Sequence, residues 1–181
     1  MVVLCGKGGA GKDTVSKILR DVYGIPKVVT YTTRPKRQGE KDGESYHFIT
    51  KEEFLEKMKS GFFAETSCTG EHMYGSPAEA FKEKNAQIIL DPAGIGQVTE
   101  KIGSENLQIF FLDANEDLLR QRMAERGDAP EKIEERLKED NVRFENIEKY
   151  SGFTICQNGM TLADEIALFI SCMVQENCGA S

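Results

Sequence analysis

The chain of 181 residues alternates short, nearly continuous apolar runs with longer stretches in which apolar residues recur at helical spacing. The apolar runs at residues 2–5, 86–91, 107–112 and 153–156 predict buried strands, because such runs are typical of parallel sheets covered on both faces. The stretches between them predict the covering helices. This order of elements indicates an α/β fold.

Helical spacing of apolar residues is clearest at residues 15–22, 115–126 and 163–174. The stretch 131–150 also has helical character, but it is strongly charged and has only sparse apolar positions. Such a stretch is usually a solvated helix face. Short strands are predicted at 28–31 and 46–49 by their apolar and alternating residues.

Two further helix starts are marked by capping residues. Thr50 with Glu53 forms the pattern of a capping box, which predicts a helix through Met58. Ser76 is followed by Pro77 and, three residues after the serine, by Glu79. Serine as a cap with proline at the first helical position predicts a second helix start there.

Residues 6–14 join the first predicted strand to the first predicted helix and read Gly-Lys-Gly-Gly-Ala-Gly-Lys-Asp-Thr. Glycines let backbone N–H groups converge on a phosphate, and a helix N-terminus adds partial positive charge. A lysine at position 12 would reach the terminal phosphates of a nucleoside triphosphate. The sequence therefore predicts an ATP phosphate site formed by Gly6, Gly8, Gly9, Ala10, Gly11, Lys12, Asp13 and Thr14.

Position 13 departs from the usual pattern, in which a Ser or Thr hydroxyl after the lysine holds Mg²⁺. Asp13 could hold Mg²⁺ directly or through water, but its charge would also repel phosphate oxygens at close range. Thr14 could supply a hydroxyl only if the register shifted. The alternative is a glycine-rich turn that binds nothing, and the flanking strand and helix favour the phosphate site.

Composition limits the classes of protein that fit. Hydrophobic residues at 39% and charged residues at 29% are typical of a globular domain, and a net charge of −7 argues against a broad nucleic-acid surface. No apolar run approaches the ~18 residues of a membrane span, and no signal peptide is recognisable. The five cysteines lack C-x-x-C spacing, and the two histidines lack clustered partners. We therefore expect reduced thiols, no zinc site and a cytoplasmic protein.

Residues 32–48 carry the most specific pattern, Thr-Thr-Arg-Pro-x-Arg-x-Gly-Glu-x-Asp-Gly-x-x-Tyr-x-Phe. This pattern resembles the segment that binds guanosine monophosphate (GMP) in guanylate kinases. The resemblance extends to the glycine-rich loop, to residues 63–65, 74–76 and 89–91, and to the arginines between 122 and 136. It implies transfer of the γ-phosphoryl group of Mg-ATP to GMP, which gives ADP and GDP, with these nucleotides as the only partners expected.

The resemblance also implies a three-part architecture. The core would be a P-loop NTPase-type parallel sheet with helices on both faces, formed by residues 1–29, 77–121 and 141–181. An insertion at about 30–76 would bind the monophosphate, and a helical lid at about 122–140 would carry arginines. The sequence does not indicate an oligomeric state.

Site residues follow from the resemblance, position by position. Arg34 and Arg37 match the residues that clamp the GMP phosphate, and Glu65 matches the residue that reads guanine. The remaining GMP contacts match Thr30, Tyr46, Tyr74 and Ser76. The residues expected to act on the transferring phosphate are Lys12, Arg34, Asp91, Arg122, Arg126 and Arg136, and the metal candidates are Asp13 and Asp91.

Two departures leave alternatives open. The family usually has a second guanine-reading carboxylate two residues beyond Asp91, where this chain has Ala93, and residues 66–73 lack an expected aromatic residue and asparagine. A related nucleoside or deoxynucleoside monophosphate kinase with altered base specificity is therefore one alternative. A non-catalytic binding module of guanylate-kinase type is another, although such modules usually have a degraded phosphate loop.

Overall fold

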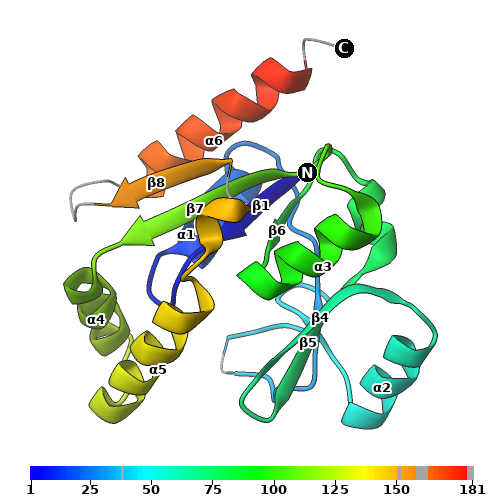
Figure 1. Ribbon diagram of the computed structural model, residues 1–181, viewed down its shortest axis with the longest axis horizontal. Coiled ribbons are helices and arrows are strands. Elements are labelled where there is room, and N and C mark those ends of the chain that lie inside the picture. Colours follow the sequence, from blue (N-terminus) through cyan, green and yellow to red (C-terminus); the bar gives the residue numbers. More distant parts are fainter. Residues whose placement is uncertain (38, 151, 158–162, 179–181) are drawn as a thin grey trace.

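The computed structural model of the chain describes residues 1–37, 39–150, 152–157 and 163–178 (Figure 1). The strands are β1 Val2–Cys5, β2 Tyr31–Thr32, β3 His47–Phe48, β4 Phe63–Thr69, β5 His72–Pro77, β6 Gln87–Ile89, β7 Gln108–Ala114 and β8 Phe153–Gln157. The helices are α1 Lys12–Asp21, α2 Lys51–Lys59, α3 Pro92–Ile102, α4 Glu116–Glu125, α5 Pro130–Arg143 and α6 Ala163–Cys178, with 3₁₀ helices η1 Ala78–Lys82 and η2 Ile147–Lys149.

The first sheet is parallel and has the strand order β6-β1-β7-β8. Successive residues of β1 face opposite sides of it. Val2 and Leu4 pack into a core with α1, α4, α5 and α6, whereas Val3 and Cys5 pack into a second core with α3. Helices therefore cover both faces, and the predicted α/β fold with a parallel sheet is confirmed.

The second sheet has the strand order β3-β2-β5-β4 and lies below the first in the view of Figure 1. Strands β4 and β5 pair antiparallel and are joined through Gly70, whose φ of 58° favours glycine. The sequence did not predict these two strands. Several of their polar residues line a cavity instead of packing in a core, so the apolar alternation that marks a strand is weak.

The capping box at Thr50 is confirmed, whereas the cap predicted at Ser76 is wrong, although a short 3₁₀ helix begins nearby at Ala78. Thr50 Oγ1 accepts the N–H of Glu53 at 3.2 Å, and the Glu53 carboxylate accepts the N–H of Thr50 at 2.8 Å, so that α2 begins where predicted. Ser76 lies inside β5 and donates its hydroxyl to Glu65, and no side chain caps the 3₁₀ helix η1 that follows Pro77.

The strand predicted at 28–31 is wrong in extent, since only Tyr31 of it belongs to β2. Val28 instead donates its N–H to Gln87 O at 2.8 Å, beside an isolated bridge between Lys27 and Gln87. This stretch leaves the edge of the first sheet and crosses to the second, so its pairing changes partway. The strand predicted at 46–49 is present as the shorter β3.

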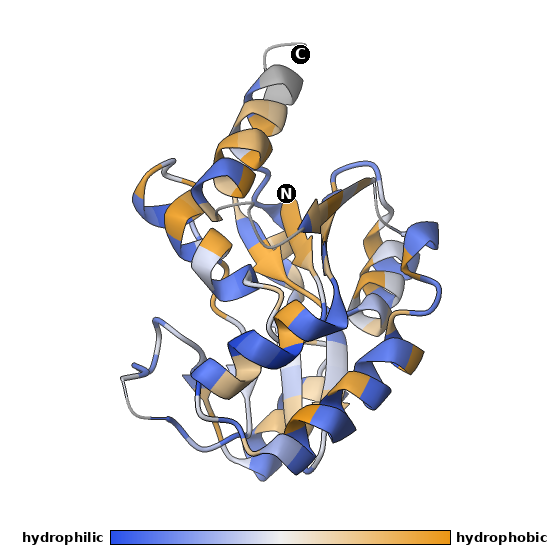
Figure 2. Cartoon of the chain, turned by 90° about the vertical axis from the view of Figure 1, so that its left-hand side faces the viewer, coloured by the Kyte–Doolittle hydropathy of each residue, from blue (hydrophilic) through white to orange (hydrophobic). Residues whose placement is uncertain are grey.

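Apolar residues of α4 and α5, among them Leu119, Met123, Ile133 and Leu137, pack into the core beside the parallel sheet, and most charged residues of these helices are exposed. Figure 2 shows the alternation of hydrophobic and hydrophilic residues along the helices. Asn115 caps α4 by accepting the N–H of Leu118 at 2.8 Å. The charged stretch predicted as helical up to Tyr150 ends as α5 at Arg143, and Ile147 of η2 is buried in the second core. None of the helices in the described ranges is long and apolar enough to cross a membrane.

Four cysteines are free, as expected: Cys5, Cys68, Cys156 and Cys172. The side chain of the fifth, Cys178, lies outside the described part of the chain.

Candidate active site

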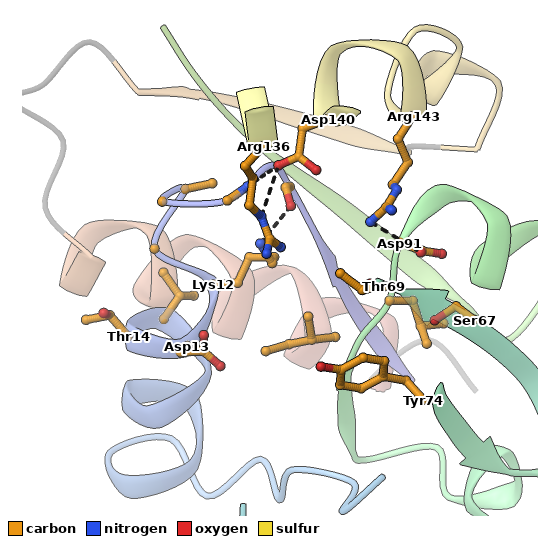
Figure 3. A pocket seen from close by; sticks show the side chains of 18 of the residues that line it. Lys12, Asp13, Thr14, Ser67, Thr69, Tyr74, Asp91, Arg136, Asp140 and Arg143 are labelled. Carbon is orange, nitrogen blue, oxygen red and sulfur yellow. Dashed lines mark hydrogen bonds and ion pairs between the residues drawn. The ribbon is translucent and has the colours of Figure 1, made fainter. Parts of the chain in front are cut away.

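A cavity of about 680 Å³ opens where the carboxyl ends of β1 and β6 meet the face of β4 and β5 (Figure 3). Crevices at the carboxyl ends of parallel strands are the usual ligand sites of α/β folds. Every residue that the sequence predicted for the site lines this cavity: Gly6, Gly8, Gly9, Ala10, Gly11, Lys12, Asp13, Thr14, Thr30, Arg34, Arg37, Tyr46, Glu65, Tyr74, Ser76, Asp91, Arg122, Arg126 and Arg136.

The glycine-rich loop needs its glycines for conformation and for space. Gly9 and Gly11 have φ of 81° and 85°, a region that other residues rarely adopt. A Cβ on Gly6 would lie 2.8 Å from the carbonyl oxygen of Leu112 on β7. Gly11 precedes α1 without a side-chain cap, so the first N–H groups of this helix remain available to an anion.

Side chains from three other elements hold the loop in place. Gln157 at the end of β8 donates to Ala10 O at 2.9 Å, and Arg122 of α4 donates to Gln157 Oε1 at 2.9 Å and to Gly9 O at 3.3 Å. Asp140 of α5 accepts the N–H of Gly8 at 2.7 Å. The loop is therefore fixed before any ligand binds.

Lys12 lies inside this loop. Its ammonium donates to Gly6 O at 2.7 Å and to Lys7 O at 2.9 Å. Burial lowers the pKa of Lys12 from its usual range, while the charge of Asp13 acts in the opposite direction. An anionic ligand would supply the partner charge that the buried ammonium lacks.

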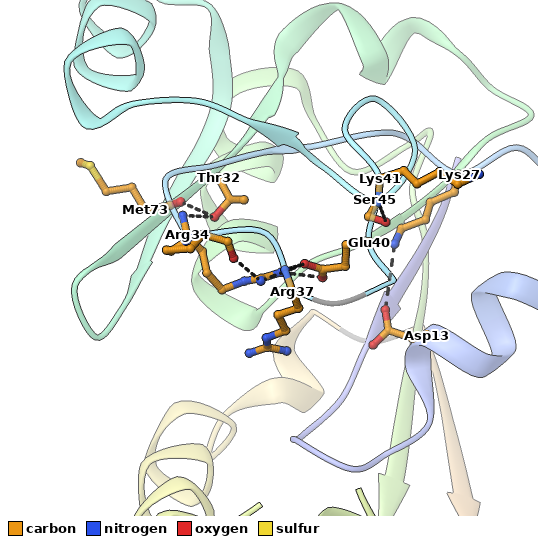
Figure 4. A network of polar contacts seen from close by, with 10 residues as sticks. Asp13, Lys27, Thr32, Arg34, Arg37, Glu40, Lys41, Ser45 and Met73 are labelled. Carbon is orange, nitrogen blue, oxygen red and sulfur yellow. Dashed lines mark hydrogen bonds and ion pairs between the residues drawn. The ribbon is translucent and has the colours of Figure 1, made fainter. Parts of the chain in front are cut away.

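Arg34 lies on the opposite side of the cavity in a network with Glu40 (Figure 4). Arg34 is 8% exposed, and its guanidinium makes two hydrogen bonds with the Glu40 carboxylate, at 2.7 and 3.0 Å. Glu40 also accepts the backbone N–H of Arg37 at 2.7 Å. The hydrogen bond from Arg34 lowers the pKa of Glu40, so this carboxylate is ionised and holds the arginine in place.

Glu65 is the buried carboxylate of β4, with 4% exposure. Burial raises its pKa to about 7, the hydroxyl of Ser76 lowers it by donating to Oε1 at 2.5 Å, and the charge of Asp91 raises it. Glu65, Ser67 and Thr69 alternate along β4 and all line the cavity, as strand geometry requires of residues on one face.

Asp91 lies beside Glu65, across the open side of Gly94. A Cβ on Gly94 would lie 3.0 Å from Glu65 Oε2 and 3.3 Å from Asp91 Oδ1, so both carboxylates approach the same point. Asp91 also caps α3 by accepting the N–H of Gly94 at 2.7 Å, and its Oδ2 lies 4.0 Å from Arg143. The cavity therefore contains a second carboxylate next to Glu65, although position 93 is alanine.

The three arginines expected in the lid differ in their contacts. Arg122 is half-buried and bonded to the loop, as described above. Arg126 is exposed and pairs with Asp128, and Arg136 is 3.8 Å from Asp140 through its Nε. Each of these arginines is thus paired with an oxygen atom of the protein itself.

The fit of a magnesium ion can be tested on the two metal candidates. Mg²⁺ keeps several waters and takes one or two carboxylates together with substrate phosphates. The Asp13 side chain is 86% exposed at the start of α1, and its nearest cation partner, Lys27, is 4.0 Å away. Asp91 already caps α3 and faces Arg143. Asp13 is therefore better placed than Asp91 to make a single contact to Mg²⁺.

Several cavity residues were not predicted from the sequence: Ser67, Thr69, Glu125, Asp140, Arg143 and Gln157. The spacing of Arg136, Asp140 and Arg143 on α5, four and then three residues apart, could have indicated a shared face. The alternation of Ser67 and Thr69 with Glu65 could have done the same for β4. Nothing local marks Gln157, which reaches the loop only through the pairing of β7 with β8.

The parallel sheet, the glycine-rich loop before α1 and the cationic cavity define an α/β protein of the P-loop NTPase fold class. A model of the guanylate kinase family matches residues 1–168. Guanylate kinase from Fusobacterium nucleatum is 37% identical over a region that covers 83% of this chain and 84% of that protein. Guanylate kinase from Clostridium perfringens is 31% identical over a region that covers 98% of this chain and 84% of that protein.

Solved structures agree with these matches. A crystal structure of guanylate kinase from Anaplasma phagocytophilum has a TM-score of 0.75 at 26% identity and covers 98% of this chain and 85% of that one. Shikimate kinase from Acinetobacter baumannii has a TM-score of 0.56 at 15% identity, which shows likeness of fold alone. The chain belongs to the guanylate kinase family.

Proposed function

We propose that this chain transfers the γ-phosphoryl group of Mg-ATP to GMP and releases ADP and GDP. The observation that carries the proposal is that one cavity contains both a phosphate-type loop on one side and a buried Arg34 with a buried Glu65 on the other. Phosphoryl transfer requires a protein to hold two anionic nucleotides close together and to offset their repulsion. Membership of the guanylate kinase family supports the same reaction.

The donor's phosphates would bind the N–H groups of residues 8–14 and the ammonium of Lys12. Asp13 is the residue that would hold Mg²⁺, directly or through water, and the metal would offset charge on the donor phosphates. Thr14 lies beside it at the cavity wall. The phosphate-binding role of this loop and the magnesium requirement are parts of the proposal.

The acceptor's phosphate would bind Arg34 and Arg37, together with the hydroxyls of Tyr46 and Tyr74. A guanidinium can bind a phosphate with two parallel hydrogen bonds, which lysine cannot do. Burial raises the pKa of Tyr46 to about 12, so its hydroxyl stays protonated and can donate. Arg34 would have to share or exchange its present partner, Glu40.

The guanine base would be read by carboxylates. Ionised Glu65 can accept from guanine N1–H and N2–H₂ together, whereas adenine presents a lone pair at N1. A buried carboxylate facing a lone pair costs several kcal/mol, which is the source of base selectivity. Asp91, which approaches the same point as Glu65, is the second carboxylate of this proposed base site. Thr30 and Ser76 would add hydroxyl contacts.

During transfer, Arg122, Arg126 and Arg136 would stabilise charge on the moving phosphoryl group, a contribution of about 10³-fold or more in rate. In this proposal residues 30–76 form the monophosphate-binding part and residues 122–140 the lid of a core made from the remaining chain. Closure of both parts would exclude water, so that ATP is not hydrolysed. A cytoplasmic location is proposed with it, in keeping with the four free cysteines.

A coupled assay of ADP release tests the proposal. Mg-ATP is offered with GMP, AMP, CMP, UMP and the deoxy-monophosphates in parallel, and strong selective turnover of GMP is expected. Lys12→Met should reduce turnover by about 10²-fold or more while leaving the thermal unfolding curve in place, because it removes the charge that contacts the donor phosphates. Turnover by this variant at the wild-type rate would contradict the proposed mechanism.

Two outcomes of the assay would point elsewhere. Preference for a different monophosphate would keep the reaction and move the base specificity. Binding of ATP or GMP without turnover of any acceptor would favour a non-catalytic binding module.

A further inference from the structure

Asp140 is a buried carboxylate to which the proposed reaction gives no role. It lies near the C-terminal end of α5 with 3% exposure. Its Oδ2 accepts the N–H of Gly8 at 2.7 Å and lies 3.8 Å from Nε of Arg136 (Figure 3). Its charge also acts on the ammonium of Lys12, whose pKa it raises against the larger effect of burial. A carboxylate oxygen therefore sits among the groups assigned above to the donor's phosphates.

The helix itself does not explain this carboxylate. Negative charge near the C-terminal end of a helix is disfavoured by the helix dipole. Burying a carboxylate also costs several kcal/mol unless hydrogen bonds and cations compensate for the lost water. The compensation comes from Gly8, Arg136 and Lys12. Asp140 is thus stabilised by the same contacts that would stabilise a phosphate.

The attachment of α5 to the loop does not depend on Asp140 alone. Lys7 Nζ donates to Asn141 Oδ1 at 2.7 Å, and Asn141 Nδ2 donates to Glu116 of α4 at 2.7 Å. Ile133 and Leu137 bury α5 against the core. Removing the charge of Asp140 should therefore leave α5 and the loop in place.

We propose that Asp140 is a competing anion of the donor site, which holds Gly8 and Arg136 in the nucleotide-free protein and is displaced when a donor phosphate binds. The proposal rests on the donor role proposed for the glycine-rich loop. It requires that the charge of Asp140 weaken binding of polyphosphates. It also requires no effect on the nucleoside part of the donor or on the acceptor, which bind elsewhere in the cavity.

Calorimetric titration of Asp140→Asn tests this directly. Asparagine keeps the shape and can still accept the N–H of Gly8, but it lacks the charge. The matched control is Glu139→Gln, which removes one negative charge from the exposed neighbour on the same helix. The ligands are ATP, inorganic tripolyphosphate, adenosine and GMP, at one fixed magnesium concentration.

We expect Asp140→Asn to bind ATP and tripolyphosphate about tenfold more tightly, a change of about 1.4 kcal/mol. Adenosine and GMP should bind within about twofold of wild type, and Glu139→Gln should match wild type for all four ligands. The fold-changes are read only from variants whose thermal melts show a folded protein. Asp140→Ala removes both the charge and the hydrogen-bond acceptor. Its affinity for ATP and tripolyphosphate should also be higher than that of the wild type.

Weaker or unchanged polyphosphate binding in Asp140→Asn and Asp140→Ala would overturn the proposal and make Asp140 a brace for the loop. Absence of tripolyphosphate and ATP binding in every protein, wild type included, would overturn it too. GMP turnover by the wild-type protein is a separate measurement. A failed competition by Asp140 can therefore be distinguished from a failed kinase reaction.

Discussion

Glu65, which lines the cavity, and Glu40, which holds Arg34 beside it, are in opposite electrostatic situations. The hydrogen bond from Arg34 lowers the pKa of Glu40, which therefore stays charged at neutral pH. Burial raises the pKa of Glu65 to about 7, against the hydrogen bonds from the hydroxyl and the backbone of Ser76, which lower it. The acceptor's phosphate and its base would thus meet a permanently ionised network on one side and a titrating carboxylate on the other.

The raised pKa of Glu65 predicts a pH dependence of stability. The folded protein holds the Glu65 proton more tightly than the unfolded chain does, so the stabilisation is complete below about pH 4.5 and is lost as the pH rises through about 7. Glu65→Gln, which is neutral at every pH, should not show this loss. Urea unfolding of both proteins between pH 5 and 8 should give free energies of unfolding whose difference changes by about 1–3 kcal/mol in favour of the variant.

A difference that stays constant over this pH range would show that Glu65 is already ionised in the folded protein. The comparison cancels the other titrating groups that the two proteins share. Glu65→Asp adds a check, because the shorter carboxylate should still titrate.

The sequence could predict the identity of these residues but not their charge states. Resemblance singled out Arg34, Glu65 and Ser76 together with the loop. The pairing of Arg34 with Glu40 and the approach of Asp91 to Glu65 depend on distances between strands and loops that no local pattern records. The sequence shows that position 93, where the family usually has a second guanine-reading carboxylate, is alanine, but it does not show that Asp91 lies next to Glu65 across Gly94.

Among the secondary-structure elements, α3 has a specific relation to β4. Gln97 of α3 uses both atoms of its amide on the backbone of Thr66, accepting its N–H at 3.1 Å and donating to its carbonyl at 2.8 Å. One turn later, Lys101 donates to Phe63 O at 3.2 Å. These contacts bracket Glu65 on both sides along the strand. The helix α3, which packs on the first sheet, therefore positions Glu65, the proposed base-reading residue of the second sheet.

Gln97→Ala should disturb this positioning and leave the donor side intact. Loss of the two hydrogen bonds should raise KM for GMP about fivefold, equivalent to about 1 kcal/mol, with KM for ATP unchanged. Steady-state kinetics with each nucleotide varied in turn measures both constants. Glu100→Ala, an exposed change on the same helix, serves as the control and should behave as wild type.

Equal rises of the two KM values would instead indicate a general loss of structure. Gln97→Glu gives a further test, since it keeps the acceptor for Thr66 N–H but loses the donor to Thr66 O. It should fall between wild type and Gln97→Ala.

The same elements show which predictions a single sequence supports. The core strands and the α2 cap were predicted correctly because their signals lie within a few residues. Ser76 was misassigned as a helix cap because its partner, Glu65, belongs to a different strand. Strands β4 and β5 were missed because the polar residues on one of their faces are selected by the cavity and not by burial in a core.

Considered as a whole, the molecule consists of two sheets with a cationic cavity between them, although its net charge is −7. Arg34 is paired with Glu40, Arg126 with Asp128 and Arg136 with Asp140. Nucleotide binding would replace several of these internal partners at once. This exchange of partners would couple movement of residues 30–76, which include Arg34, to movement of residues 122–140, which include Arg126 and Arg136.

We therefore expect residues 30–76 and residues 122–140 to close over the cavity only when phosphates occupy both its donor side and its acceptor side. Small-angle X-ray scattering should show a smaller radius of gyration with GMP plus a non-hydrolysable ATP analogue than with either alone. Adenosine with GMP is the matched control, because it provides the same base and ribose without the donor's phosphates. An unchanged radius with both nucleotides would mean that the nucleotide-free arrangement is already closed.

The central position of β1 has a consequence for how the chain is made. Its neighbours β6 and β7 begin more than eighty residues later along the chain. During synthesis at about 5–20 residues per second, the apolar segment Val2–Cys5 leaves the ribosome about four seconds or more before either neighbouring strand. Chains interrupted before β7 would expose this strand without a sheet to join. We expect such fragments to depend on chaperones, and the glycine-rich loop to take its final shape only late in folding.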